Sequence, residues 1–171
     1  HGVVHRQTDG RPARREHRVK DSRYKGIYVF SGDRHDDDAA VCGKPLGIDV
    51  DLVDLRIAPG HDLLDDEVWS KFTSKMATDE YKALLEAPPC STFCNARGVG
   101  DGPRKLRSPA HPYGIPGLTP DELKQVKVGT ACALRALHAA SIFDDAGKPF
   151  ILETSAKYGS NVNMFDLSEF E

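Results

Sequence analysis

The chain has 171 residues, of which 39% are hydrophobic and 29% are charged, and its formal net charge is −3 at pH 7. This length predicts one domain with a sizeable core, while no apolar run approaches the ~20 residues of a membrane span and no apolar secretory signal opens the chain. The four cysteines are too sparse and irregular for a disulfide framework, which favours a soluble protein in a reducing, intracellular compartment, cytoplasmic or nuclear.

Charge is unevenly distributed along the chain. Residues 1–25 contain eight Lys or Arg and three Asp or Glu, a net charge of +5, which leaves −8 for the remainder. Because this segment has almost no large apolar side chains, it cannot build a core of its own. We therefore expect a basic arm or linker over residues 1–25 and a single domain over residues 26–171. The arm suits contact with nucleic acid, or it is a linker from a longer parent chain.

The first predicted elements are two strands separated by a weak helix. Residues 27–30 form a continuous apolar run that ends at Ser31-Gly32-Asp33, a pattern typical of a buried parallel strand. Acidic residues at the start of residues 36–46 predict a short helix, which the following Gly and Pro residues interrupt. A second strand is expected over residues 48–55.

An acidic side chain leaves this second strand. In nucleotide-binding α/β folds a carboxylate at this place accepts hydrogen bonds from ribose hydroxyls. Asp54 is the favoured candidate, since Asp49 and Asp51 are expected to face solvent along the strand.

Next come a capped helix and a strand that stops at two prolines. Asp65 is the expected N-cap of a helix reaching about Met76, with Trp69 in the core. Residues 81–85 read as a buried strand, and Pro88-Pro89 then force the backbone out of any ladder. Cys90 follows them on a stiff loop at the strand's end, where it is a candidate nucleophile. The alternative is a small buried hydrophobe.

The longest irregular stretch spans residues 95–117. Loops of this length inside a domain are usually functional or disordered. Three of its basic residues, Arg97, Arg104 and Arg107, suit a phosphate-bearing substrate, or they are simply solvated.

The last predicted elements are a long helix and a short strand. Thr119-Pro120-Asp121-Glu122 is a capping box that opens a helix reaching about Phe143. Residues 150–152 form another buried strand, and Glu153 leaves it. The alternation of strands and helices predicts an α/β fold with a mainly parallel sheet flanked by helices.

The segment Ala87-Pro88-Pro89-Cys90 at a strand's end, followed by Ser91-Thr92-Phe93, resembles the Pro-Pro-Cys motif of cytosine-C5 methyltransferases. The likeness is strongest to the short, divergent methyltransferase-like domains of phages and mobile elements, and it extends in order from about Gly26 to Phe170. Further segments that resemble this family are residues 28–32, 53–54, 61–64, 106–108, 117–120, 151–153 and 164–167.

The resemblance implies a Rossmann-like fold and a DNA-binding transferase that methylates cytosine. It implies S-adenosylmethionine as the cofactor, with contacts from Phe30, Ser31, Gly32, Asp54, Asp62 and Pro88. Cys90 would add to C6 of a flipped or single-stranded cytosine while the carboxyl of Glu153 holds N3. Cys94 and Cys132 are expected to pack away from that site. No metal is expected, because no second ligand pair accompanies Cys90 and Cys94.

Departures from the family pattern keep two alternatives open. Thr154-Ser155 follow Glu153 where the family has Asn or Asn-Pro, the first loop has one glycine, and no target-recognition domain fits in the chain. One alternative is therefore a catalytically degenerate interaction or scaffold domain with the same fold. The other is a GTPase-like domain, because residues 152–157 resemble the Glu-Thr-Ser-Ala-Lys segment of small GTPases. Residues 38–45, however, lack the phosphate-loop pattern.

Overall fold

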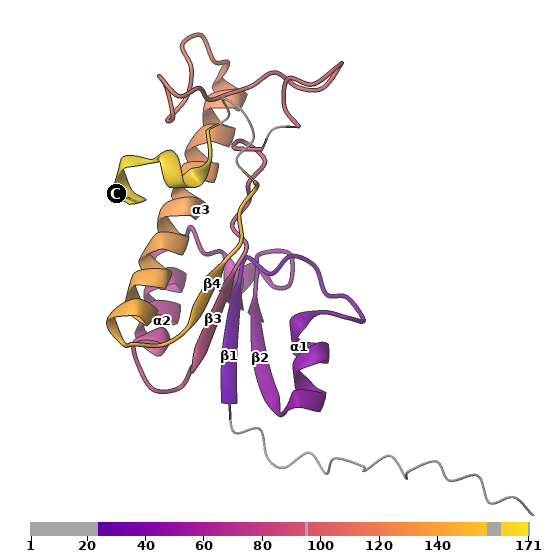
Figure 1. The fold of residues 1–171 in the computed structure, drawn as a ribbon, viewed down its shortest axis with the longest axis vertical. Coiled ribbons are helices and arrows are strands. Elements are labelled where there is room, and N and C mark those ends of the chain that lie inside the picture. The colour runs from indigo at the N-terminus through magenta and orange to yellow at the C-terminus, as the bar shows by residue number, and fades with distance from the viewer. Residues whose placement is uncertain (1–23, 95, 157–161, 171) are drawn as a thin grey trace, which may run out of the picture.

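A single parallel sheet organises the computed structural model, which describes residues 24–94, 96–156 and 162–170. The strands are β1 (Tyr24–Val29), β2 (Ile48–Val53), β3 (Ala83–Glu86) and β4 (Phe150–Leu152), in the order β2-β1-β3-β4. The helices are α1 (Ala39–Gly43), α2 (Asp66–Met76) and α3 (Pro120–Asp145). Helices α2 and α3 cover one face of the sheet and α1 lies against the other (Figure 1). The fold is therefore α/β with an all-parallel sheet, as predicted.

The strand order reverses direction between β1 and β3. The chain passes from β1 to β2 on one side and then returns to β3 on the other side of β1. Val29 at the end of β1 is in register with Val53 of β2 and with Glu86 of β3. In open parallel sheets the crevice outside the carboxyl ends, at such a reversal, is where ligands bind. Residues 30–32, 54–65 and 87–94 all leave the sheet at this edge.

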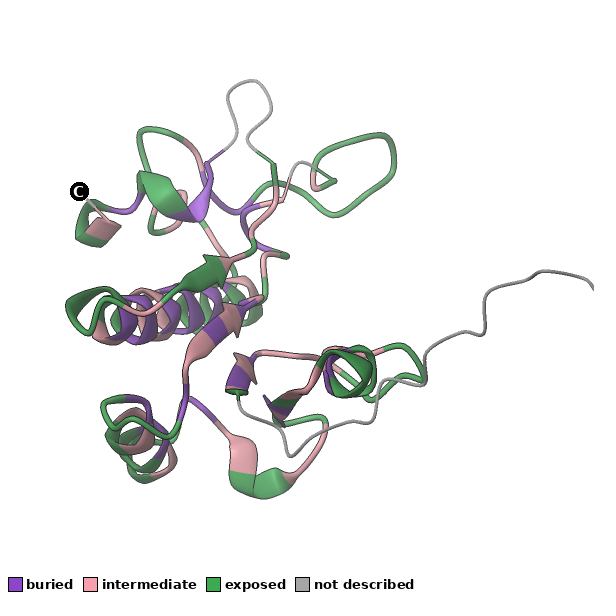
Figure 2. Cartoon of the chain, turned by 60° about the horizontal axis from the view of Figure 1, so that its bottom comes forward, coloured by how far each residue is buried: buried purple, intermediate pink, exposed green. Residues whose placement is uncertain are grey.

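The main core lies between the sheet and helices α2 and α3. Ile27 and Val29 of β1 and Leu84 of β3 point to this face because strand side chains alternate. They pack against Trp69, Phe72 and Met76 of α2 and Ala139 and Phe143 of α3. Figure 2 shows this arrangement, with the buried side of α3 turned toward the strands. On the opposite face Ala40 of α1 packs on Val50 and Leu52.

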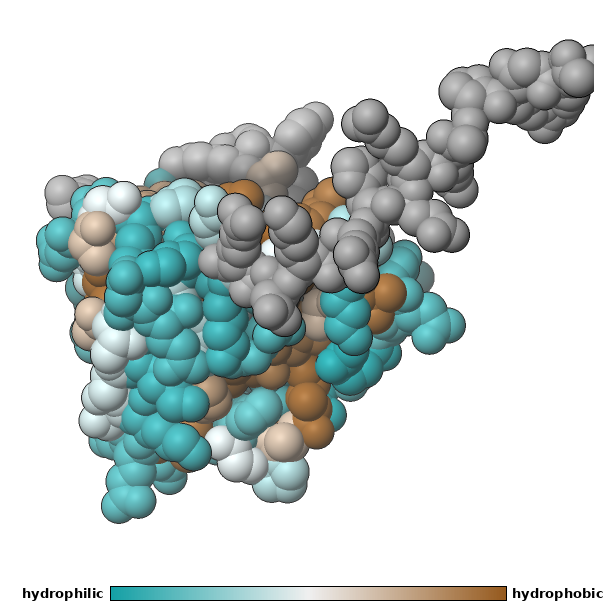
Figure 3. All heavy atoms as spheres, turned by 90° about the horizontal axis from the view of Figure 1, so that it is seen from below, coloured by the Kyte–Doolittle hydropathy of each residue, from teal (hydrophilic) through white to brown (hydrophobic). Residues whose placement is uncertain are grey.

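The amino end of the sheet carries charged side chains that pair with one another. The side chain of Asp51, expected to face solvent, is 39% exposed, and it also accepts a hydrogen bond of 2.6 Å from the Tyr81 hydroxyl and forms an ion pair of 2.9 Å with Lys25. The hydrogen bond forms because Tyr81 is buried and its hydroxyl needs an acceptor. Seen from below, hydrophobic residues gather in a band across an otherwise mainly hydrophilic face (Figure 3).

Most element boundaries agree with the prediction. Asp65 is the N-cap of α2, the Thr119 capping box opens α3, and β4 occupies residues 150–152. Strand β4 is not the buried strand expected: because it lies at the edge of the sheet, Phe150 is 39% and Ile151 66% exposed. Strand β1 begins at Tyr24, so Tyr24 and Lys25 belong to the sheet and not to the predicted arm. The expected basic arm otherwise falls on residues 1–23, which lie outside the described residues. Helix α1 is shorter than predicted, since Lys44–Leu46 form a 3₁₀ turn.

Candidate functional site

The β1–β2 half of the carboxyl edge is held together by the carboxylate of Asp54. Its Oδ2 accepts a hydrogen bond of 3.0 Å from the backbone N–H of Gly32, and its Oδ1 accepts one of 2.8 Å from that of Arg56. Gly32 has φ +73°, a left-handed conformation that favours glycine. Phe30 also has a positive φ of 57° and continues the ladder by donating to the Val53 carbonyl at 2.9 Å. Asp54 and the first loop therefore form one unit, as predicted.

A pocket of about 260 Å³ opens beside this unit. It is lined by Phe30, Asp54, Leu55, Arg56, His61, Asp62, Leu63, Leu64, Pro89, Val128 and Cys132. Three of the six predicted cofactor contacts, Phe30, Asp54 and Asp62, line its wall, whereas Ser31 and Gly32 are not among its lining residues. Of the prolines it is Pro89, and not the predicted Pro88, that reaches the pocket, because Pro88 is buried beneath it. The pocket lies at the strand-order reversal, since its walls come from the ends of β1, β2 and β3.

Two buried polar atoms at the β1–β2 half of this edge have no hydrogen-bond partner among the described residues. They are Ser31 Oγ and His61 Nδ1, both buried. The His61 ring packs edge-on against Phe72 with centroids 5.6 Å apart, which fixes its orientation in the pocket wall. Buried polar atoms of this kind need an explanation, and a bound ligand or water is one.

Cys132 reaches the pocket from helix α3. We expected it to pack away from the site. It is buried, but its side chain also lines this pocket. Burial, followed by the charges of Asp62 and Asp54, raises the pKa of its thiol to about 11, so the thiol is neutral at pH 7. Val128 lies one turn earlier on α3. Its i, i+4 spacing from Cys132 is the sequence signal that could have placed both residues on one face of the helix.

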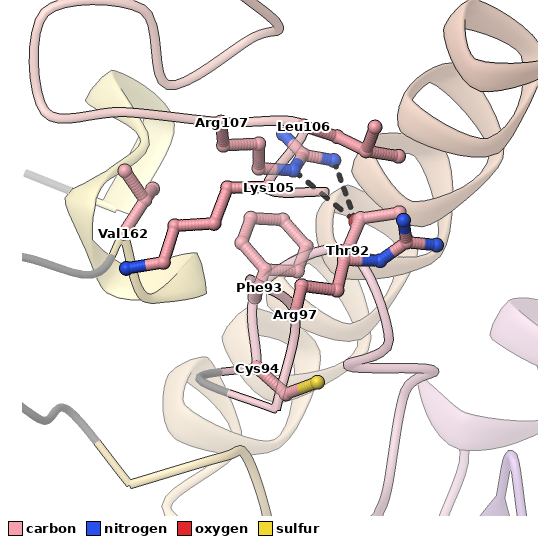
Figure 4. Close-up of a pocket in the computed structure, with 8 residues that line it drawn as sticks. All are labelled: Thr92, Phe93, Cys94, Arg97, Lys105, Leu106, Arg107 and Val162. Atoms are coloured by element: carbon pink, nitrogen blue, oxygen red, sulfur yellow. Dashed lines mark hydrogen bonds between the residues drawn. The ribbon is translucent and has the colours of Figure 1, made fainter. Parts of the chain in front are cut away.

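Cys90 follows β3 and opens a tight turn. Its carbonyl accepts hydrogen bonds from the N–H groups of Phe93 at 2.8 Å and Cys94 at 2.9 Å. Cys90 is half-buried, whereas Thr92 and Phe93 are buried beneath it. Cys94 lies at a separate hollow of only about 10 Å³, room for one water, together with Arg97, Lys105 and Arg107 (Figure 4).

The three arginines predicted to bind substrate are engaged within the protein. Arg97 donates to the Ser91 carbonyl at 2.9 Å and to Gln125 Oε1 at 2.6 Å. Arg104 forms an ion pair with Glu122, which lowers the pKa of that carboxyl to about 2. Arg107 is 5% exposed and makes five hydrogen bonds to protein atoms. The prediction did not anticipate that the long loop needs these side chains as internal braces.

Two glutamates end neighbouring strands with opposite environments. Glu153 follows β4, its N–H donates to the Glu86 carbonyl at 2.7 Å, and its side chain is exposed. The hydroxyl of Tyr28 has a raised pKa, first through burial and then through the charge of Glu153. Glu86 is only 1% exposed, neither carboxyl oxygen has a partner among the described residues, and burial raises its pKa to about 9. It is therefore protonated at pH 7.

The structure brings Cys90 and Glu153 to adjacent strand ends but not into direct contact. The hydrogen bond between residues 86 and 153 joins the two strands four residues before Cys90. Neither Cys90 nor Glu153 is among the described residues that line the 260 Å³ pocket, which ends at Pro89. The shared cavity that the sequence predicts for the two side chains therefore remains a prediction.

Some classes of site are absent from the described part of the chain. None of its helices is long and apolar enough to cross a bilayer. Across residues 24–94, 96–156 and 162–170, no three His, Cys, Asp or Glu side chains converge as metal ligands would. At the start of α1 the Asp38 carboxylate accepts from the Val41 N–H at 3.0 Å, so a negative charge occupies the place where a GTPase-like loop would hold phosphate.

Comparison with known proteins adds no assignment. No protein-family model, curated protein or solved structure matches this chain. The function is therefore argued from the sequence motif and from the site itself.

Proposed function

We propose that this chain is an S-adenosylmethionine-dependent methyltransferase domain with a Rossmann-like fold that acts on C5 of cytosine in nucleic acid. The observation that carries the proposal is the coupling of Asp54 to Gly32, which joins the ends of β1 and β2 beside a pocket at the strand-order reversal. This is the arrangement with which open α/β sheets hold the ribose of a nucleotide-like ligand. The Pro-Pro-Cys segment that follows β3 specifies the chemistry.

The residues of the pocket fit the cofactor. The Asp54 carboxylate accepts two backbone hydrogen bonds, and its two oxygens have further lone pairs for ribose hydroxyls. Phe30, Leu64 and Val128 offer apolar walls to a planar base. His61 lines the pocket and its buried Nδ1 lacks a partner, which a polar ligand would supply. Ser31, whose Oγ also lacks a partner, lies in the adjoining first loop. The cofactor, when bound, supplies an electrophilic methyl group.

In the proposed reaction, Cys90 and Glu153 act on the cytosine from neighbouring strand ends. The Cys90 thiolate forms a bond to C6 while the Glu153 carboxyl and N3 share a proton in a hydrogen bond, so that electron density moves to C5. Once C5 carries the methyl group, a water molecule takes the C5 proton, and the electron pair of that C–H bond forms the C5–C6 double bond as the Cys90–C6 bond breaks and the thiolate is released. The target base has to leave the stack to reach a site at a sheet edge.

Nucleic acid is the proposed partner. Residues 1–23, which precede β1, contain seven Lys or Arg and three Asp or Glu, a net charge of +4, while the whole chain carries −3. A basic segment attached to an acidic domain brings the charge needed to bind phosphates without requiring Arg97, Arg104 or Arg107 to leave their internal partners. Binding through this segment should weaken with increasing salt.

Calorimetric titration of the folded protein tests the cofactor assignment. We expect heat of binding with S-adenosylmethionine and none with a guanosine triphosphate analogue. Trapping of the protein by an oligonucleotide containing 5-fluorocytosine, in the presence of cofactor, tests the chemistry. Absence of binding at millimolar cofactor by a protein that melts cooperatively would contradict the proposal and favour the scaffold alternative.

A further inference from the structure

The turn that carries Cys90 is anchored to helix α3 through its next residues. Thr92 and Phe93 are 5% and 4% exposed, whereas Cys90 itself is half-buried. Phe93 packs against Ala133 of α3 and against Met164 and Leu167 near the end of the chain. The position of Cys90 is therefore set by what holds Thr92 and Phe93, the second and third residues after it.

Arg107 holds Thr92 from the opposite side. Its Nε and Nη2 both donate to Thr92 Oγ1 at 3.1 Å, and the guanidinium carbon lies 3.8 Å from the centre of the Phe93 ring (Figure 4). Nη2 also donates to the Val126 carbonyl at 2.9 Å and to Thr130 Oγ1 at 3.0 Å, both on α3. Nη1 donates to the Pro112 carbonyl at 2.6 Å in the long loop. One buried guanidinium thus ties together the Cys90 turn, the long loop and α3.

Gly129 supplies the space for this contact. It lies in the middle of α3, where glycine is unfavourable for a helix. A Cβ atom at this position would lie 2.6 Å from Thr92 Oγ1 and 3.4 Å from Arg107 Nη2. The helix therefore keeps a residue that weakens it so that the Thr92 hydroxyl and the guanidinium can approach its backbone.

We propose that Arg107, Thr92 and Gly129 form a clamp that positions the Cys90 nucleophile, which makes Arg107 a positioning residue and not the substrate-binding residue that the sequence suggested. The clamp rests on the proposed function in so far as Cys90 is the nucleophile. It fixes the backbone two residues after Cys90 without contacting the reacting atoms. A displacement of about 1 Å at a reacting group can cost roughly 100-fold in rate.

Thiol alkylation tests the clamp on the folded protein without substrate. The rate of iodoacetamide labelling at Cys90 and Cys94 is followed by peptide mass spectrometry in Thr92→Val, which keeps the side-chain shape but removes the acceptor, and in Thr92→Ser, which keeps the hydroxyl. We expect Thr92→Val to speed labelling of Cys90 by at least about threefold through local opening of the turn, and Thr92→Ser to match the wild type. Thr73→Val on α2 is the matched control, because its hydroxyl is bonded only within that helix.

Methyl transfer gives the second readout. Thr92→Val should lower kcat by roughly 10- to 100-fold with KM for S-adenosylmethionine unchanged, and Thr92→Ser should restore kcat. If the wild type transfers methyl groups and Thr92→Val equals it in both labelling and kcat, the clamp is refuted while the proposed function stands. If the wild type transfers none, the proposed function fails and the labelling rates still decide the clamp.

For Gly129→Ala, helix propensity and the clamp predict opposite changes in the melting temperature. Alanine in an unobstructed helix would raise the melting temperature by a few degrees. With the clamp in place the new methyl group meets Thr92 Oγ1, so we expect a lower melting temperature and faster Cys90 labelling. If Gly129→Ala instead has a higher melting temperature and unchanged Cys90 labelling, the proposal is overturned. This test still applies if Thr92→Val does not fold.

Discussion

The two halves of the sheet's carboxyl edge are organised by opposite means. At the β1–β2 half an anionic side chain, Asp54, accepts backbone N–H groups and leaves a pocket beside it. At the β3–β4 half a buried cation, Arg107, donates to the turn that follows β3, while the Glu86 carboxyl is buried without a partner among the described residues. The first half is arranged around space for a ligand, and the second around the fixed position of one thiol.

This difference indicates that the proposed cofactor binding and the proposed placement of the nucleophile depend on separate sets of contacts. Asp54 acts through the ends of β1 and β2, and Arg107 acts through Thr92 and α3. The two halves meet at Pro89, which lines the pocket and immediately precedes Cys90. Lesions in one half should therefore leave the readout of the other half largely unchanged.

The largest expected effect is the loss of chemistry at the β3–β4 half. Cys90→Ser should abolish methyl transfer and trapping by 5-fluorocytosine DNA, while Cys94→Ser should retain both. Glu153→Gln should slow transfer by about two to four powers of ten, the usual range for losing a positioned acid. Calorimetric affinity for S-adenosylmethionine should not change in any of the three. Transfer that persists in Cys90→Ser would contradict the assignment of the nucleophile.

The second effect concerns Glu86 and stability as a function of pH. Burial raises its pKa from 4.5 to about 9, so between these values the folded protein keeps a proton that the unfolded chain has lost. Stability should consequently fall as pH rises through this window and level off above about pH 9. From about pH 5 to about pH 7 the wild type should lose about 3 kcal/mol of unfolding free energy relative to Glu86→Gln.

Urea unfolding at several pH values measures this difference. Glu67→Gln, at an exposed position in the first turn of α2, is the matched control and should keep the wild-type pH dependence. Equal slopes for the wild type and Glu86→Gln would show that the Glu86 carboxyl has reached water or a partner. Such a result would remove the buried, unpartnered carboxyl that distinguishes the β3–β4 half from the β1–β2 half.

The helices and strands could be predicted from local patterns, because a few residues mark the start or the course of each one. Asp65 and the Thr119–Glu122 box marked the starts of α2 and α3, and continuous apolar runs marked β1 and β4. Strand order could not be predicted, since it depends on which strand ends pair after the chain returns from α2. The same limit applies to the shift of β3 to Ala83–Glu86, where the Pro149 carbonyl accepts from the Leu84 N–H.

The site could be predicted only where one residue acts alone. Asp54 was singled out because a carboxylate after the second strand has a recognised role, and the structure places it in the pocket wall, while its binding of a ribose stays a prediction. Glu86 was missed, although its alternation with Leu84 assigns it to the core face of β3, because a buried unpaired carboxyl contradicts ordinary burial preferences. Arg107 was assigned to substrate because its partners Thr92 and Val126 are far from it in sequence.

The third effect is the loss of cofactor affinity at the β1–β2 half. Asp54→Ala removes the carboxylate that braces Gly32 and that would accept the ribose hydroxyls. We expect the calorimetric Kd for S-adenosylmethionine to rise at least about tenfold, or about 1.4 kcal/mol, and the ligand-induced rise in Tm to shrink accordingly. Asp49→Ala, exposed on the same strand, should bind like the wild type. An unchanged Kd in Asp54→Ala would remove the ligand site from this half.

The smallest expected effect tests whether α3, which both halves share, couples them. Val128 and Cys132 line the pocket from α3, and Gly129 between them faces Thr92. Thr119→Ala removes the hydroxyl that accepts from the Glu122 N–H at 3.3 Å and should cost about 1 kcal/mol of unfolding free energy, whereas Thr119→Ser should cost only a few tenths. Because Thr119 lies about two and a half turns before Val128 and fraying is confined to the first turn, cofactor Kd and Cys90 labelling should stay within about twofold of the wild type. A parallel loss of both would show that the helix transmits strain between the halves, and the separability argued above would then be wrong.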